Sequence, residues 1–461
     1  MREKQQRGKS RIVEKQYTVR EGDSLYQIGK KLGTVPEGIY ILNHLKSDRL
    51  EIGQKLWIPS YVEAQVLYED TPVYRWESTE GESLGELDAG CRLEVVGTTQ
   101  DFLAVRYLRQ KGYLRRKDAQ LIAYGAQLPV IGVLGYYMEE ERGGFPSSEE
   151  AFDAGNDVLT SCALFFWRLD PGNPGLLENN ADASPEEILK RVRKGHRNNV
   201  QMLAVVQNLT YPEADLAGQT VQLVLVDEGH RRALVTSILS LITEYGMDGV
   251  NLDLEEIAAE DEEKYHDFLE ELAGALHEAG YSLSVCVPAR EADEEEGTEA
   301  FNYRRIAETA DHMVIMMYNE HGWPGSGSGP VSSTPWMEAV LDYALQQAEP
   351  QKIVAAVGLF GFDFNVTTGR VRYISHAQAM RLAEQYHAQP RYDREKQSWM
   401  FEYQGVGGEV HEVWYDDERS IEERAYTASR YGIWGLGLWR LGLGDPDLWQ
   451  MLRTQTVVRK E

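Results

Sequence analysis

The chain has 461 residues, 42% of them hydrophobic and 10% aromatic, which is enough for two to four domains with packed cores. Its net charge of −27 argues against a nucleic-acid-binding protein, because phosphate binding depends on clustered lysine and arginine. No window is long and apolar enough to span a bilayer, and the polar first fifteen residues contain no segment typical of a signal peptide. We expect a monomer without nucleic-acid or membrane partners.

Three cysteines, Cys91, Cys162 and Cys286, are widely spaced along the chain. An odd number with this spread does not indicate a disulfide framework. Cys286 lies in the apolar run YSLSVCVPAR, so we expect it to be a small core residue.

The first folded part is expected at residues 16–60, after a polar tail at residues 1–15. The strand-like segment YTV is followed by a Gly22 turn, a helix capped by Ser24, a second helix and the strand of IGQKLWIP. This β-α-α-β order, with the motifs GDSL and GQKLWIP, closely resembles the LysM domain. The resemblance implies binding of N-acetylglucosamine-containing glycans such as peptidoglycan or chitin. The implied contact residues are Gly22, Asp23, Ser24, Leu25, Asn43 and Ile52. A spacer without affinity for sugar is the alternative.

Residues 61–124 carry short alternating runs, including CRLEVVG, FLAVRY and KGYLRR, separated by turns that contain glycine. This spacing predicts a small all-β domain. It resembles bacterial SH3-like domains, although its motifs are weaker than those of the preceding part. A rigid spacer and a second wall contact explain it equally well.

Residues 129–455 follow a different pattern, in which apolar strands alternate with helical stretches. The eight strand candidates are VIGVLGYY, CALFFW, VQMLAVVQN, GVNLDLE, YSLSVCV, HMVIMMY, KIVAAVGLF and GIWGLGLW. Eight such strands over this length predict a (β/α)₈ TIM barrel. After the seventh strand, residues 365–415 predict an inserted α+β piece, a helix followed by two strands.

The fourth strand candidate, residues 248–255, carries the chemistry. Because side chains alternate along a strand, Asn251, Asp253 and Glu255 share one face and the leucines share the other. The apolar face packs on the surrounding helices, so the polar face points into the barrel. Buried carboxylates are costly, and enzymes of this fold place their sites at the carboxyl ends of the strands. We therefore predict that Asp253 and burial together keep Glu255 protonated near neutral pH. A half-exposed strand with a wet face is the alternative.

The octapeptide DGVNLDLE matches the DGxxxDxE signature and resembles glycoside hydrolase family 18, which includes chitinases and peptidoglycan N-acetylglucosaminidases. The resemblance implies a retaining mechanism in which the substrate's acetamide is the nucleophile. Glu255 would be the acid and base, and Asp253 would orient and stabilise the oxazolinium intermediate. Family members often have aspartate at the position of Asn251. An amide can donate a hydrogen bond to Asp253 but cannot share its charge or its proton, so we expect activity to survive with an altered pH profile.

Other residues support this resemblance. Met316, Tyr318 and Asn319 match the family's Met-x-Tyr-Asp/Asn motif, whose tyrosine bonds the acetamide, and Trp439 resembles the tryptophan beneath the reacting sugar. Tyr136, Asn208 and Phe360 also lie at predicted strand ends. For these three, pocket lining and plain packing are equally good explanations.

One subgroup fits best. The run GPVSSTPWMEAVLDYAL and the segment from HEVWYDDERS to GLWRLG resemble bacterial spore-germination and cortex-lytic hydrolases, which also carry LysM domains. Phe360 stands where this subgroup often has tyrosine. The sequence thus predicts a peptidoglycan N-acetylglucosaminidase of the spore cortex, spore coat or cell wall. A chitinase and a non-catalytic glycan-binding lectin are the alternatives. No metal or nucleotide motif is present, so neither a metal nor a cofactor is expected.

Overall fold

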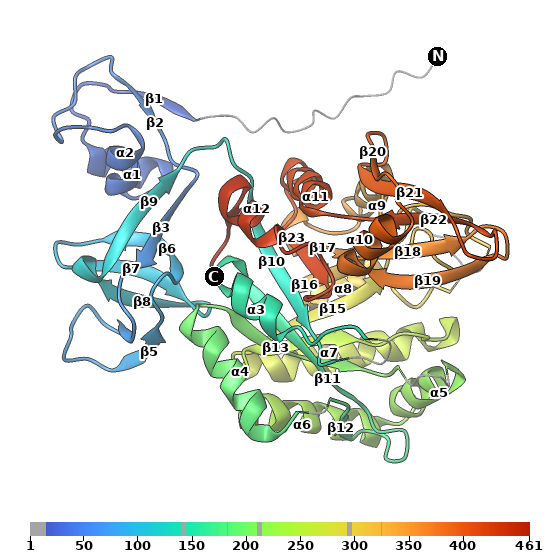
Figure 1. Ribbon diagram of the computed structural model, residues 1–461. Coiled ribbons are helices and arrows are strands. Elements are labelled where there is room, and N and C mark those ends of the chain that lie inside the picture. Colours follow the sequence, from blue (N-terminus) through green and yellow to red (C-terminus); the bar gives the residue numbers. More distant parts are fainter. Residues whose placement is uncertain (1–14, 141–143, 182, 210–213, 293–296, 324) are drawn as a thin grey trace, which may run out of the picture.

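The computed structural model describes residues 15–140, 144–181, 183–209, 214–292, 297–323 and 325–461 (Figure 1). The predicted polar tail falls outside these ranges except for residue 15. The chain forms a small N-terminal part, an all-β part and a large barrel with a projecting sheet. None of the described helices is both long and apolar enough to cross a membrane.

The N-terminal part has the predicted β-α-α-β order. Strands β1 (Gln16–Thr18) and β2 (Lys55–Trp57) pair antiparallel, and helices α1 (Leu25–Leu32) and α2 (Pro36–Leu42) lie between them in sequence. The Ser24 hydroxyl accepts a hydrogen bond from the Gln27 amide at 3.2 Å, the cap predicted for α1.

The second part is all-β, as predicted. Its seven strands are β3 (Tyr61–Val66), β4 (Thr71–Tyr74), β5 (Ser83–Leu87), β6 (Arg92–Thr98), β7 (Phe102–Tyr107), β8 (Gln110–Arg115) and β9 (Ala119–Tyr124). They form one antiparallel sheet in the order β5-β4-β8-β7-β6-β3-β9. Polar contacts join this sheet to both neighbours: Arg116 bonds Glu37 at 2.7 Å, and Arg197 of the barrel bonds Asp88 at 2.5 Å.

The third part is a closed barrel of eight parallel strands. They are β10 (Val130–Tyr137), β11 (Ser161–Leu169), β13 (Gln201–Gln207), β14 (Gly249–Asp253), β15 (Ser282–Pro288), β16 (His312–Met316), β17 (Ile353–Gly358) and β23 (Gly435–Trp439). Neighbours follow this order, and pairing of β10 with both β23 and β11 closes the ring. The predicted (β/α)₈ barrel is confirmed, and all eight strand candidates are among its strands.

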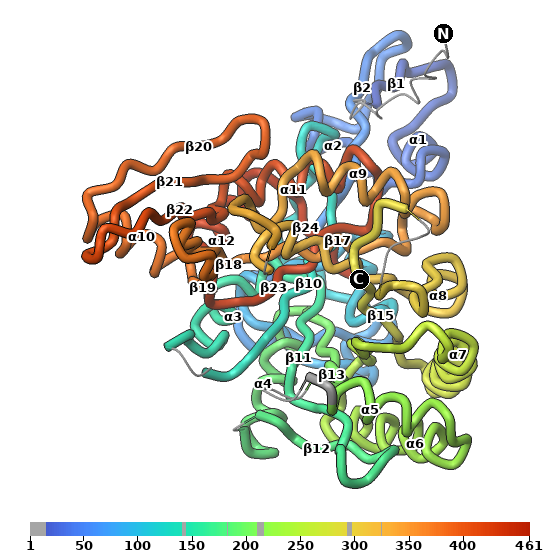
Figure 2. Tube along the Cα trace, turned by 90° about the vertical axis from the view of Figure 1, so that its right-hand side faces the viewer, coloured from blue at the N-terminus to red at the C-terminus, as the bar shows by residue number. Residues whose placement is uncertain are grey.

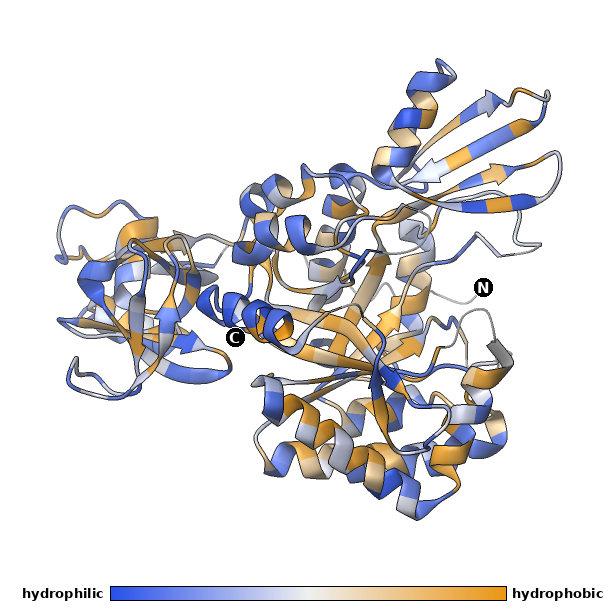
Figure 3. Cartoon of the chain, turned by 60° about the horizontal axis from the view of Figure 1, so that its bottom comes forward, coloured by the Kyte–Doolittle hydropathy of each residue, from blue (hydrophilic) through white to orange (hydrophobic). Residues whose placement is uncertain are grey.

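Helices surround the barrel, with apolar strands inside and polar outer surfaces (Figure 3). They are α3 (Glu149–Gly155), α4 (Pro185–Arg197), α5 (Ala214–Leu225), α6 (Glu228–Tyr245), α7 (Glu262–Glu278), α8 (Tyr303–Thr309), α9 (Thr334–Ala344), α11 (Glu418–Tyr431) and α12 (Leu448–Gln455). A short strand, β12 (Leu177–Asn179), pairs antiparallel with β11. Strand residues that face outward pack on the helices in one large core, and residues that face inward form a separate smaller core.

The insertion is larger than predicted. It contains β18 (Phe360–Asn365), β19 (Arg370–Ser375), α10 (His376–Gln385), β20 (Arg391–Asp393), β21 (Ser398–Gln404) and β22 (Val410–Tyr415). Its five strands form an antiparallel sheet that projects from the barrel together with α10 (Figure 2). The prediction of one helix followed by two strands missed β18, β19 and β20. The run KIVAAVGLF was assigned entirely to the seventh barrel strand, but that strand ends at Gly358 and Phe360 begins β18.

The barrel also extends beyond the predicted boundary at residue 455. A final strand, β24 (Val457–Val458), pairs with β10. Beyond it, the buried Lys460 ammonium donates to the Leu159 carbonyl at 2.6 Å, and the Lys460 amide donates to the Tyr61 hydroxyl at 2.9 Å. The last residues therefore join the barrel to the all-β part. The sequence pattern did not predict this because two residues are too few to show strand periodicity.

Candidate active site

Strand β14 presents two polar side chains to the barrel interior, as its alternation predicts. Asn251 and Asp253 are 0% and 5% exposed, while Val250, Leu252 and Leu254 belong to the core between strands and helices. The strand ends at Asp253, two residues earlier than the pattern predicts. Leu254 beyond this end is also buried, and Glu255 follows as a half-buried residue at the carboxyl end of the barrel.

The Glu255 backbone is held by Asn208, which follows β13. The Asn208 side-chain amide donates to the Glu255 carbonyl at 2.8 Å, and its oxygen accepts from the Glu255 amide at 2.8 Å. The same amide group also donates to the Ala217 carbonyl at 3.1 Å. With 1% exposure and these three bonds, Asn208 is buried and fixes the backbone of Glu255.

The environment of both carboxyls favours their protonated forms. Burial, followed by the neighbouring charges of Asp253 and Glu256, raises the pKa of Glu255 to about 8. Burial also raises the pKa of Asp253 to about 6, against the opposing effect of a hydrogen bond from Cys286. Glu255 can therefore hold a proton at neutral pH while Asp253 is ionised. Such a pair can protonate a leaving group and stabilise a developing positive charge.

The Asn251 side chain bonds the neighbouring strand β15 rather than Asp253. Its amide donates to the Ser284 hydroxyl at 2.8 Å, and its oxygen accepts from the Cys286 thiol at 3.3 Å. Sequence analysis placed Cys286 correctly in the core but missed this polar role. The apolar sequence around Cys286 does not show which side of strand β15 faces the polar residues of β14 inside the barrel.

Aromatic rings stand beside the two carboxyls. The Trp439 ring stacks on Tyr318 with centroids 6.3 Å apart, and it meets the edges of Tyr136 and Phe165 at 5.3 and 5.1 Å. Burial, then the charge of Asp253, raises the pKa of Tyr318 well above its usual value, so its hydroxyl stays a hydrogen-bond donor. Sequence analysis missed Phe165, whose only signal was its place in an apolar strand.

The remaining predicted barrel residues have different surroundings. Met316 is half-buried against the inner core, and Asn319 is exposed with a left-handed backbone at φ 63°. Phe360 is 2% exposed and packs on Tyr373, with ring centroids 4.5 Å apart, in the inserted sheet. Packing therefore accounts for Phe360, although its ring also lies 6.1 Å from Tyr318.

Most of the residues predicted to contact glycan in the N-terminal part contribute to the internal structure of that part, and one of them lies on its surface. Asp23 accepts from the Tyr17 hydroxyl at 2.9 Å, Leu25 is buried, and Asn43 exchanges hydrogen bonds of 2.7 Å with the backbone of Trp57. Ser24 caps α1, and Gly22 turns the chain at φ 82°. Ile52, by contrast, is 73% exposed and available for contact.

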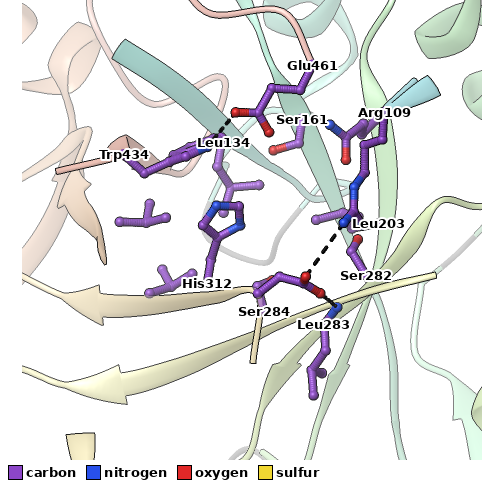
Figure 4. A pocket seen from close by; sticks show the side chains of 14 residues that line it. Arg109, Leu134, Ser161, Leu203, Ser282, Leu283, Ser284, His312, Trp434 and Glu461 are labelled. Carbon is purple, nitrogen blue, oxygen red and sulfur yellow. Dashed lines mark hydrogen bonds and ion pairs between the residues drawn. The ribbon is translucent and has the colours of Figure 1, made fainter. Parts of the chain in front are cut away.

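A cluster of three carboxylates and a cavity lie away from Asp253 and Glu255. The carboxylate oxygens of Asp417, Glu418 and Asp445 lie within 4.8 Å of one another, but Asp417 is occupied as the N-cap of α11. A cavity of about 230 Å³ lies at the opposite end of the barrel, among the first residues of several strands. Arg109 of the all-β part and the C-terminal Glu461 help to line it (Figure 4).

Comparisons with known proteins agree with this geometry. Residues 17–59 match the LysM domain. The chain is 27% identical over 451 residues to a cortical fragment-lytic enzyme of Bacillus anthracis, covering 96% of this chain and 99% of that protein. The crystal structure of the Bacillus cereus spore cortex-lytic enzyme SleL superposes with a TM-score of 0.65 at 25% identity, covering 97% of this chain and 99% of that one. A chitinase from Chromobacterium violaceum has a TM-score of 0.61 at 26% identity, covering 71% and 99%.

Residues 133–444, which include both carboxyls, Tyr318 and Trp439, match the family described as glycosyl hydrolases family 18. This match spans more than half of the chain. The chain is therefore a member of glycosyl hydrolases family 18, a glycosidase related to spore cortex-lytic enzymes.

Proposed function

We propose that this protein hydrolyses the β-1,4 bond that follows N-acetylglucosamine in peptidoglycan of the spore cortex or cell wall. One observation carries the proposal: a carboxyl whose pKa is raised to about 8, Glu255, at the carboxyl end of the barrel beside the more acidic Asp253. That arrangement supplies a proton at neutral pH where these barrels bind their substrates.

In the proposed reaction the acetamido oxygen of the bound sugar attacks its own anomeric carbon. The bond to the bridging oxygen breaks as Glu255 gives that oxygen its proton, which leaves an oxazolinium ion and a Glu255 carboxylate. The carboxylate then removes a proton from water, whose oxygen adds to the anomeric carbon and reopens the ring. Two displacements retain the configuration, and no second carboxylate is needed as a nucleophile.

The other residues have matching roles. Ionised Asp253 offsets the positive charge of the oxazolinium ion, and its Oδ1 has no hydrogen-bond partner among the described residues, so it is available to the acetamide. The Tyr318 hydroxyl is a donor for the acetamide oxygen. The half-buried Trp439 ring supplies an apolar surface for the sugar, since aromatic faces suit C–H groups.

The substrate class rests on the domain combination. LysM domains bind glycans that contain N-acetylglucosamine, and two of the compared proteins are named a cortical fragment-lytic enzyme and a spore cortex-lytic enzyme. We infer an association with the spore or the cell wall. The likeness to a chitinase favours chitin as the second candidate substrate. A non-catalytic lectin is disfavoured, because a binding site has no need of a protonated Glu255 beside an ionised Asp253.

Parallel digestion of purified spore-cortex peptidoglycan and chitin tests this proposal. The products are reduced with borohydride and their new ends are identified by mass spectrometry. We expect N-acetylglucosaminitol ends from peptidoglycan, absent with the Glu255→Gln variant. Cleavage of chitin alone would replace peptidoglycan with chitin as the substrate, and binding of both without cleavage would indicate a lectin.

A further inference from the structure

The side-chain amide of Asn251 has a fixed orientation inside the barrel. The Ser284 hydroxyl donates to the Val250 carbonyl at 3.3 Å, so its oxygen accepts from the Asn251 amide at 2.8 Å. The Asn251 oxygen is thereby turned towards Cys286, whose sulfur lies 3.3 Å away. Asn251 therefore offers an acceptor to the thiol, and its amide donates to Ser284 rather than to Asp253.

The Cys286 thiol has one proton and two acceptors. One acceptor is the Asn251 oxygen, and the other is the Asp253 carboxylate, whose pKa is lowered by hydrogen bonding with this thiol. The Tyr136 oxygen lies 3.4 Å from the sulfur. Because the thiol proton is needed by the two acceptors, the Tyr136 hydroxyl is the donor in that contact.

We propose that Cys286 is a positioning residue of the reaction, whose single thiol proton alternates between the Asn251 oxygen and the Asp253 carboxylate. This inference rests on the proposed function. When Asp253 is ionised the thiol donates to the stronger acceptor, the carboxylate, and supports its charge during formation of the oxazolinium ion. When Asp253 is neutral the proton returns to Asn251. No covalent bond of Cys286 is made or broken.

The surroundings keep Cys286 a donor throughout. Burial, then the charge of Asp253, raises the pKa of its thiol well above the usual range, so it does not compete with Asp253 for ionisation. The charge of Asp253 acts on titratable groups from several parts of the barrel: Tyr136 of β10, Cys286 of β15, Tyr265 of α7, Tyr318 after β16 and Glu255 after its own strand. Burial raises the pKa of each, so Glu255 is the one that titrates near Asp253.

The chain offers a matched control for this cysteine. Cys162 is also fully buried in a barrel strand, but it faces the outer core between strands and helices. Burial alone raises the pKa of the Cys162 thiol. Cys162→Ala therefore reports the effect of a cysteine substitution that only disturbs packing.

The test compares pH–rate profiles of the full-length wild type, Cys286→Ala, Cys286→Ser and Cys162→Ala on a soluble chito-oligosaccharide. Loss of a hydrogen bond to a charged group should move the acid limb of Cys286→Ala upward by about one pH unit, with kcat falling about tenfold at pH 5 and KM unchanged. Cys286→Ser keeps a hydrogen-bond donor and should retain the acid limb of the wild-type pH–rate profile. Cys162→Ala should retain it as well.

Carbon-13 NMR of the Asp253 carboxyl, assigned with Asp253→Asn, gives the same information without turnover. We expect its pKa to rise in Cys286→Ala and to be restored in Cys286→Ser. An unchanged pKa and acid limb in Cys286→Ala would overturn the inference, as would equal shifts in the alanine and serine variants. A wild type that cleaves no glycan would instead refute the proposed function, and the NMR titration would still decide the role of the thiol.

Discussion

The side chain of Asn208 bonds both backbone groups of Glu255, at 2.8 Å each. Asn208 follows β13 and Glu255 follows β14, so this pair links the ends of two adjacent parallel strands. Glu255 lies beyond the end of its own strand, where no strand hydrogen bonds restrain it. Its position relative to Asp253 therefore depends on Asn208.

Replacing Asn208 with alanine should lower kcat by about 100-fold, because small displacements of a catalytic group are costly. It should also reduce the free energy of unfolding by about 2 kcal/mol, since buried backbone groups lose their partners. Steady-state kinetics and urea denaturation measure the two effects. Asn199→Ala is the control: Asn199 is equally buried but accepts from the Leu108 amide at the contact with the all-β part. Similar losses of kcat in both variants would show that Asn208 acts only through stability.

The activity should depend on pH as a bell-shaped curve with its maximum between about pH 6 and pH 8. Rate rises as Asp253, with a pKa of about 6, ionises, and falls as Glu255, with a pKa of about 8, loses the proton that it must donate. The profile of kcat/KM on a soluble oligosaccharide measures both limbs. An activity that stays constant from pH 7 to pH 10 would show that Glu255 is not the acid.

The unfolding free energy should also depend on pH through the Glu255 carboxyl, and the direction of that dependence follows from its raised pKa. The pKa of Glu255 is raised from 4.5 to about 8 in the folded protein, so its contribution is complete below about pH 4.5 and is lost as the pH rises through 8. Between pH 5 and pH 9 the wild type should lose about 4 kcal/mol more unfolding free energy than Glu255→Gln. Urea denaturation at several pH values measures this difference, and parallel curves would contradict it.

The parts of the site that sequence could predict are those set by local periodicity. Alternation along residues 250–255 placed Asn251 and Asp253 inward, and the eight apolar runs predicted the barrel. The hydrogen bonds from Asn208 to the Glu255 backbone, and the contact of the Cys286 thiol with Asn251, depend on how neighbouring strands align. In this register Gln207 lies opposite Asp253 and Asn251 lies opposite Ser284. A single sequence does not contain that register. The inserted strand β18 was missed because its apolar residues continue directly from β17.

Replacing Tyr318 with phenylalanine should lower kcat by about 100-fold with little change in KM, because the hydroxyl orients the acetamide oxygen for attack on the anomeric carbon. The stacked contact with Trp439 remains in this variant. Tyr137→Phe is the control, since that hydroxyl bonds Arg191 outside the barrel interior at 2.8 Å. A comparable effect on both variants would remove Tyr318 from the reaction.

The role of Glu255 as the acid is tested most directly by the turnover of Glu255→Gln on purified peptidoglycan at pH 7. Glutamine keeps the size and backbone contacts of Glu255 but holds no transferable proton. We predict that turnover falls at least about 1,000-fold while glycan binding persists, and that Glu260→Gln, an exposed neighbour, keeps wild-type activity. Hydrolysis by Glu255→Gln at a rate near that of the wild type would contradict this role.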